Sequence, residues 1–159
     1  MTGTAQRYTA IIDSPCGRLG IADNNEVVTG IHFLDDFAPC QSPLSRLADQ
    51  TVRQLETFFS DPQFEFDLPL IESSTSFQQR ARNALRAIPV GETVSYGKLA
   101  ASMSSSARAV AGACRRNPVP IIVPCHRVIA SNGMGGFSGS VDGKPLRIKR
   151  WLLEHEHAC

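Results

Sequence analysis

Residues 117–131 read NPVPIIVPCHRVIAS and combine a stiff backbone with a reactive pair of side chains. The three prolines of this stretch fix φ and remove backbone donors, so it can be neither the interior of a helix nor a central strand. The stretch is apolar nonetheless, which predicts that it is buried. A buried, proline-fixed segment that presents a thiol beside an imidazole, Cys125-His126, indicates that the thiol takes part in chemistry.

Composition narrows the class of protein. The chain has 159 residues, 42% of them hydrophobic, which suffices for one domain or two small ones. It contains no apolar run of the roughly 20 residues that a membrane span needs, and its start, MTGTAQRYTAII, lacks the layout of a signal peptide. We therefore expect a globular, cytoplasmic protein. The five cysteines form no CxxC pair, which favours reduced thiols, and Cys16, Cys40 and His32 lack a fourth ligand, so we predict no metal.

The charge is divided unevenly along the chain. Residues 1–70 hold 4 of the 16 lysines and arginines and 10 of the 15 acidic residues, a net charge of −6, whereas residues 71–159 carry +7. This asymmetry favours a nucleic-acid partner for the second half. Mutual attraction between the two halves is the alternative.

The first half alternates short β-rich runs with turn residues. These runs predict an antiparallel sheet with strands over residues 7–12, 17–22 and 27–34. Apolar residues at three- and four-residue spacing then predict a helix, with Ser42 as its N-cap and Pro43 at its first position. Residues 63–70, QFEFDLPL, alternate like a further edge strand.

The second half is predominantly helical by pattern. A first helix begins after Ser74, Thr75 or Ser76, and helices over residues 96–103 and 107–116 are separated by three serines. Helix, short turn and helix is the pattern of a helix-turn-helix. In the second helix of this pair, the residues around Arg108 are mostly alanine and glycine. Such small side chains allow close approach to a nucleic-acid backbone or, alternatively, form an ordinary packing face.

The end of the chain combines a glycine-rich loop with a closing helix. Residues 131–140, SNGMGGFSGS, include four glycines, which permit positive φ and close backbone approach. A last helix is predicted from residue 146 to about residue 155, with Glu154 and Glu156 near its end. Its predicted inner face consists of Ile148, Trp151, Leu152 and His155.

Taken together, these motifs resemble one protein family. VSYG, ARAV, NPVPIIVPCHRV, a glycine-rich loop ending in FSG, and KRWLLEHE follow the order and approximate spacing of O6-alkylguanine-DNA alkyltransferases over most of residues 74–159. The resemblance implies a ribonuclease H-like α/β domain over residues 1–70. It also implies a mostly α-helical domain over residues 71–159, with a winged helix-turn-helix for DNA binding and alkyl transfer.

The resemblance implies a single-turnover repair reaction without a cofactor. An alkyl group passes from O6 of guanine, and by expectation from O4 of thymine, to Cys125, whose thioether product cannot leave again. A relay runs from Cys125 through a water to His126 and on to Glu156, with Glu154 as the neighbouring alternative. Tyr96 matches the hydrogen-bond donor to the departing guanine.

The implied partner is double-stranded DNA, bound as a monomer through the minor groove with the damaged base flipped out. Arg108 matches the residue that fills the vacated stack, and Ser95, Tyr96, Ala107 and Ala109 accompany it. The turn before Arg108 is two residues shorter than usual in the family, and Phe137 replaces a frequent tyrosine. Arg127 is expected to form a structural ion pair. The implied substrate-pocket residues are Asn117, Pro120, Val128, Ser131, Phe137 and Ser138.

Two other functions fit parts of the pattern. One is a sensor of the alkyltransferase-like kind, which recognises alkylated bases without repairing them; such relatives lack the cysteine that stands here as Cys125. The other is an unrelated cysteine hydrolase with a Cys-His pair, against which the flanking NPVP and the helix-turn-helix pattern argue.

Overall fold

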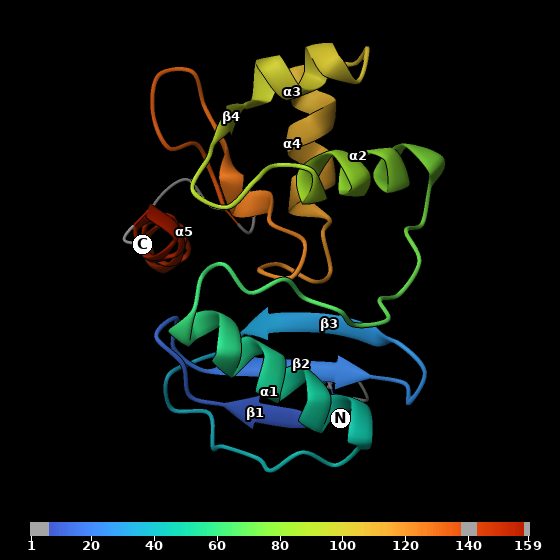
Figure 1. Cartoon of the computed structure of the whole chain (residues 1–159), viewed down its shortest axis with the longest axis vertical. Coiled ribbons are helices and arrows are strands. Elements are labelled where there is room, and N and C mark those ends of the chain that lie inside the picture. Colours follow the sequence, from blue (N-terminus) through green and yellow to red (C-terminus); the bar gives the residue numbers. More distant parts are fainter. Residues whose placement is uncertain (1–6, 138–142, 158–159) are drawn as a thin grey trace. The chain divides into compact units, whose positions relative to one another are not determined.

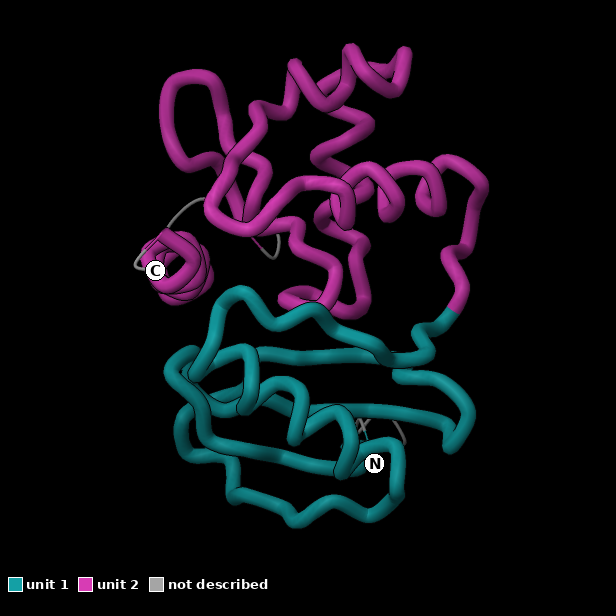
Figure 2. The backbone as a smooth tube through the Cα atoms, viewed as in Figure 1, with its two compact units in different colours: residues 1–71 teal, residues 72–159 magenta. Residues whose placement is uncertain are grey.

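The computed structural model describes residues 7–137 and 143–157. The chain divides into two compact units, Met1–Ile71 and Glu72–Cys159, coloured separately in Figure 2. In the described ranges, no helix is long and apolar enough to cross a membrane.

From residue 7 onward, the first unit is a three-stranded antiparallel sheet with one helix packed against it (Figure 1). Its strands β1 (Ala10–Ile12), β2 (Leu19–Asp23) and β3 (Val28–Phe33) lie in sequence order. Ile21 of β2 stands opposite both Ala10 and Ile31, so apolar side chains share one face. The helix α1 (Arg46–Ser60) buries Leu55 and Phe58, and this layer forms the core of the unit.

The start of α1 differs from the sequence prediction. The N-cap is Ser45 rather than Ser42, and its hydroxyl accepts a hydrogen bond from the amide of Ala48 at 2.9 Å. The amide of Leu44 donates to the carbonyl of Thr9 at 2.8 Å, which holds the chain extended beside the sheet until Ser45. The prediction of Pro43 at the first helical position was therefore wrong because a long-range hydrogen bond competes with the local signal.

The predicted edge strand over residues 63–70 is also absent. The carbonyl and amide of Asp67 pair with the side-chain amide of Gln54, at 3.0 and 2.9 Å, instead of with a neighbouring strand. Phe66 packs against Phe58 of α1, with ring centroids 5.5 Å apart. The segment reaches the sheet at its end, where Leu70 forms an isolated parallel bridge to Val28 and the Val28 amide donates to the Pro69 carbonyl at 2.8 Å. The alternating pattern here serves aromatic packing on α1.

The described residues of the second unit form four α-helices and a small parallel sheet. Its elements in chain order are α2 (Ser76–Arg86), β4 (Val94–Ser95), α3 (Tyr96–Ser102), α4 (Ala107–Arg115), the 3-10 helix η1 (Cys125–Arg127), β5 (Val128–Ile129) and α5 (Gly143–His157). In the sheet, Val94 pairs with Val128 and Ser95 with Ile129. This pairing sets the start of α3 beside the chain that follows Cys125.

Side-chain caps define where α2, α3 and α4 begin. Thr75, Ser95 and Ser106 each accept a hydrogen bond from a backbone amide three residues later. In the turn between α3 and α4, Ser104 adopts φ +53°, and the guanidinium of Arg80 donates to the carbonyl of Met103. The predicted pair of helices with a short intervening turn is therefore present.

The last helix is longer than the sequence indicated. It spans Gly143–His157, because Pro145 falls within its first turn, where a missing amide proton costs nothing. Its buried residues also differ from the prediction. Lys149 and Glu156 are buried with Ile148 and Leu152, whereas Trp151 and His155 are only half-buried.

Candidate active site

The segment before Cys125 folds into a compact, hydrogen-bonded turn. The amide of Val123 donates to the carbonyl of Val119 at 3.0 Å, and the Asn117 side chain donates to the carbonyl of Val123 at 3.0 Å. Ile121 within the turn has φ +74°, an unusual conformation for a β-branched residue. As predicted, the part of this stretch before Cys125 is neither helix nor strand, and Asn117 links the end of α4 to it. The part from Cys125 onward differs, because it forms a short 3-10 helix and a two-residue strand.

Cys125 begins η1 and is buried, with 6% of its surface exposed. Burial raises the pKa of its thiol, while the hydrogen bond from Asn117 and the charge of Lys149 act in the opposite direction. The thiol is therefore protonated at neutral pH, and a nearby base is needed before it can act as a thiolate nucleophile.

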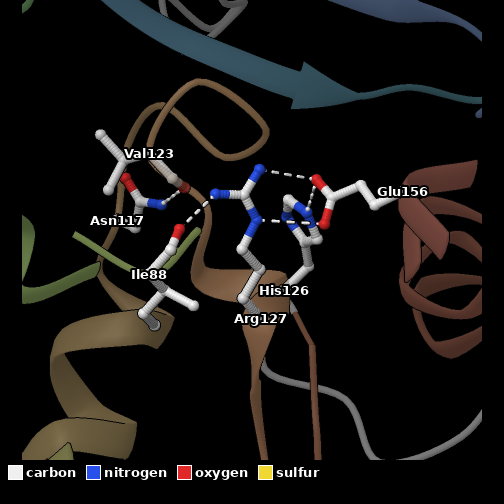
Figure 3. A network of polar contacts seen from close by, with 6 residues as sticks. All are labelled: Ile88, Asn117, Val123, His126, Arg127 and Glu156. Carbon is white, nitrogen blue, oxygen red and sulfur yellow. Dashed lines mark hydrogen bonds and ion pairs between the residues drawn. The ribbon is translucent and has the colours of Figure 1, made fainter. Parts of the chain in front are cut away.

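His126 and Glu156 form a fully buried pair (Figure 3). The His126 Nε2 atom lies 2.8 Å from Glu156 Oε2, joining η1 to α5. Glu154 is exposed on the same helix, so Glu156 is the glutamate that the fold brings to His126. His126 Nδ1 is also buried and has no hydrogen-bond partner among the described side chains and backbone.

Arg127 contacts the same carboxylate from the next position of η1. Its Nε donates to Glu156 Oε1 at 3.0 Å and its Nη2 to Oε2 at 2.8 Å. Its third nitrogen, Nη1, donates to the carbonyl of Ile88 at 2.7 Å. The expected structural ion pair of Arg127 is thus present, and its partner is the carboxylate that also holds His126.

The protonation state of this pair follows from its surroundings. Burial would raise the pKa of Glu156, but hydrogen bonds and charges from His126 and Arg127 outweigh it and lower that pKa to about 2. Burial lowers the pKa of His126, and the charges of Arg127 and Lys149 add to this against the pull of Glu156. His126 is therefore neutral at pH 7. Because an ionised carboxylate only accepts, Nε2 carries the proton and Nδ1 is free to accept one.

Lys149 of α5 is a site residue that sequence reasoning missed. Its Nζ is completely buried and donates to the carbonyls of Val128, Met134 and Gly136 at 2.7, 2.7 and 2.9 Å. Burial lowers its pKa to about 8. A signal was available, because Lys149 lies seven residues before Glu156 and three before Leu152, on one helical face.

Tyr96 lies beside the loop that contains Met134 and Gly136, whose carbonyls Lys149 holds. Its hydroxyl donates to the carbonyl of Gly136 at 3.4 Å, and the Lys149 ammonium lies 5.8 Å from the centre of its ring. Gly135 has φ +75°, and a Cβ there would come within 2.9 Å of the ring, so only glycine fits. Burial raises the pKa of Tyr96 to about 12, helped by the charges of Cys114 and Cys125, so the phenol remains a proton donor.

The predicted DNA-contacting residues lie at the starts of α3 and α4. Ala107 and Arg108 are exposed in the first turn of α4, and Ala109 is half-buried. Ser95 caps α3, and Tyr96 is the first residue of that helix. Arg108 is thus presented outward by a helix that has only small side chains beside it.

The predicted pocket residues differ in exposure. Pro120, Val128 and Phe137 are buried, Asn117 is half-buried, and Ser131 is exposed. Ser138 lies outside the described residues. Across the ranges that the structure describes, no group of three histidine, cysteine, aspartate or glutamate side chains could hold a metal ion.

Comparison with known proteins identifies the family. A model described as "6-O-methylguanine DNA methyltransferase, DNA binding domain" matches residues 76–158. The chain is 37% identical to the methylated-DNA–protein-cysteine methyltransferase of Methanosarcina acetivorans over 160 residues, covering 96% of this chain and 99% of that protein. It is 40% identical to that of Mycobacterium tuberculosis over 152 residues, covering 91% and 89%.

A solved structure agrees with these sequence matches. The crystal structure of Mycobacterium tuberculosis OGT in complex with DNA aligns with a TM-score of 0.78 and 39% identity, covering 93% of this chain and 91% of that one. The mixed α/β fold is therefore shared along nearly the whole length of both proteins. The chain belongs to the O6-methylguanine-DNA methyltransferase family, the methylated-DNA–protein-cysteine methyltransferases.

Proposed function

We propose that this protein repairs DNA by transferring a methyl or larger alkyl group from O6 of guanine to its own Cys125. The observation that carries the proposal is the buried thiol that directly precedes a neutral histidine held by an ionised glutamate. A soft thiolate suits attack at an alkyl carbon, and the histidine supplies the base that a protonated thiol needs.

The proposed reaction assigns a separate role to Cys125, to the His126–Glu156 pair and to Tyr96. Through a bridging water, His126 Nδ1 accepts the Cys125 proton, while the Nε2–H group stays hydrogen-bonded to Glu156. The thiolate sulfur then bonds to the alkyl carbon, the bond from that carbon to O6 breaks, and its electron pair stays on guanine. Tyr96 donates a hydrogen bond to the departing base, and the thiol proton ends on that base.

One reaction consumes one protein molecule. The product at Cys125 is a thioether, and its sulfur cannot be displaced under the conditions of the first step. The protein is therefore a stoichiometric reagent and turns over once. O4-alkylthymine presents the same kind of alkyl–oxygen bond and is proposed as a second substrate.

We also propose that α3 and α4 form a winged helix-turn-helix that binds the minor groove, and that the first unit is a ribonuclease H-like domain. The small residues beside Arg108 allow α4 to approach the DNA backbone closely, and Ser95 with Tyr96 begins the neighbouring helix. Arg108 would replace the flipped nucleotide in the base stack, which offsets a flipping cost of a few kcal/mol. Asn117, Pro120, Val128, Ser131 and Phe137, together with Ser138, are proposed to surround the base.

Locating the transferred methyl group tests this function. After incubation with a duplex that contains O6-methylguanine, the intact protein should gain the mass of one methyl group per chain. Trypsin cuts after Arg116 and Arg127, so the peptide 117–127 contains Cys125 and no other cysteine. We expect the methyl group on this peptide alone, with guanine restored in the DNA.

Other results would contradict the proposal. Methylation of another cysteine, such as Cys114 in the preceding peptide, would exclude Cys125 as the acceptor. Tight binding of the alkylated duplex without a mass change would indicate a sensor.

Arg108→Ala tests the role of the exposed arginine on α4. Without a side chain to fill the vacated stack, the flipped state loses its stabilisation, so transfer from duplex DNA should slow by at least about tenfold. The rate with the free base O6-benzylguanine, which needs no flipping, should stay within about twofold of the original. Both rates are followed by mass spectrometry of the alkylated protein.

Arg115→Ala serves as the matched control, because Arg115 is an exposed arginine in the last turn of the same helix. It removes the same charge from the protein. An equal loss of rate in the two variants would show that Arg108 acts only through general electrostatic attraction to DNA. An equal loss with duplex and free base would remove Arg108 from the flipping step.

A further inference from the structure

Each of the three nitrogens of the Arg127 guanidinium donates a hydrogen bond to a carbonyl or carboxylate oxygen. Its Nε and Nη2 grip the two oxygens of Glu156 at 3.0 and 2.8 Å, and Nη1 donates to the Ile88 carbonyl at 2.7 Å. In Figure 3 the guanidinium lies between Ile88 on one side and the His126–Glu156 pair on the other. Because the guanidinium is planar, these three hydrogen bonds fix its orientation. They therefore also fix the position of the Glu156 carboxylate.

Glu156 Oε2 consequently serves two donors at once. Arg127 Nη2 and His126 Nε2 each lie 2.8 Å from it. In a buried histidine–carboxylate pair without another cation, the negative charge favours a second proton on the imidazole. Here a permanently charged guanidinium already neutralises that carboxylate, so protonation of His126 gains much less.

The other groups around His126 act in the same direction as Arg127. Lys149 of α5 contributes a second positive charge that opposes protonation of the imidazole, whereas Glu156 favours it. The thiol of Cys125, the preceding residue, is protonated at rest because it is buried. Among the described residues, Arg127 is a cation that contacts the carboxylate directly, so it reduces the negative charge that His126 meets.

We propose that Arg127 is a positioning residue of the transfer reaction, which holds Glu156 so that His126 keeps one proton on Nε2 and offers Nδ1 to the proton of Cys125. This inference rests on the proposed function. Arg127 acts through Glu156 and not on the thiol, on which the hydrogen bond from Asn117 and the charge of Lys149 act. A lysine in its place would keep the charge but has one nitrogen and cannot form the fork.

Arg127→Met and Arg127→Lys separate this role from simple structural support. In each variant, the protonation of His126 is followed by NMR against pH, in protein that carries isotope-labelled histidine. In Arg127→Met, His126 should take up its second proton at a pH at least about one unit higher than in the original protein. Arg127→Lys should shift the midpoint in the same direction by a smaller amount.

The pH dependence of the transfer rate is a second measurement, which a mere loss of protein stability would not shift. The rate with O6-benzylguanine should fall at low pH as Nδ1 becomes protonated. In Arg127→Met, the pH at which the rate falls should rise by the same interval as the NMR midpoint. Arg147→Met, an exposed arginine on α5, is the control and should leave both midpoints in place.

An unchanged His126 titration in Arg127→Met, accompanied only by a lower melting temperature, would overturn the proposal and leave Arg127 a structural role. If Arg127→Met does not fold, Arg127→Lys decides, because an unshifted midpoint there would contradict the proposal equally. If the original protein transfers no alkyl group, the proposed function fails. The NMR titration still tests the link between Arg127 and His126 in that case.

Discussion

Cys125→Ser is expected to abolish alkyl transfer while leaving DNA binding intact. Serine is close in size to cysteine. The substitution also keeps the backbone contacts of residue 125, such as the hydrogen bond from its amide to the Val123 carbonyl at 2.8 Å. A hydroxyl is ionised far less readily than a thiol and is a harder nucleophile, so His126 cannot generate a useful nucleophile from it. The variant should show no mass gain over a period in which the original protein reacts completely.

Duplex binding measured in parallel shows whether the variant is folded. Cys125→Ser should bind duplex that contains O6-methylguanine with an affinity within about threefold of the original protein and should keep it bound, because the lesion remains in place. Cys40→Ser is the matched control: Cys40 is an exposed thiol of the first unit, and its loss should leave the methyl stoichiometry unchanged. Residual methylation of Cys125→Ser would show that another residue accepts the alkyl group.

Lys149→Met should cause the largest loss of stability among the variants considered. The substitution removes the Lys149 ammonium from three backbone carbonyls, those of Val128, Met134 and Gly136, of which Gly136 keeps the longer hydrogen bond from Tyr96. Unpaired buried acceptors cost about 1–3 kcal/mol each, partly offset because a buried ammonium is itself unfavourable. A net loss of about 3 kcal/mol corresponds to a fall of roughly 6–12 °C in Tm for a chain of this size.

The same substitution should also slow transfer. The carbonyl of Gly136 receives both Lys149 and the Tyr96 hydroxyl, so the loop that faces Tyr96 loses its anchor. The Cys125 thiolate loses a nearby positive charge as well. We expect the rate with O6-benzylguanine to fall by about tenfold or more at a temperature where the variant is folded. Arg150→Met, an exposed neighbour on α5, is the control, and an equal effect there would remove the special role of Lys149.

The stability difference between Lys149→Met and the original protein should depend on pH. Burial lowers the pKa of Lys149 to about 8 in the folded protein, against roughly 10.4 for an unfolded chain. Between these values the unfolded state binds more protons, so the contribution of Lys149 to stability rises with pH. The gap between the two proteins should therefore widen from about pH 8 to pH 10, as measured by denaturant unfolding. A constant gap would contradict burial of this amine.

Helix boundaries that depend on neighbouring residues could be predicted from the sequence. The helices observed at Tyr96–Ser102 and Ala107–Arg115 end within one residue of the prediction, and Thr75 was among three proposed caps. Caps and prolines act over three or four residues, so their effect is visible in a linear sequence. The first helix of the chain began later than predicted because Leu44 bonds to Thr9, which is far away in the sequence.

By itself, the sequence determined the family and the reactive pair, because PCHRV between NPVP and the WLL helix identifies Cys125 and His126 directly. It left the partner of His126 open, since Glu154 and Glu156 are only two residues apart. Successive helical residues are separated by about 100°, so these glutamates lie on nearly opposite sides of α5. Only the packing of α5 against η1 decided that Glu156 is buried beside His126 and that Lys149 anchors the loop. Such packing depends on contacts between distant residues, which no local pattern records.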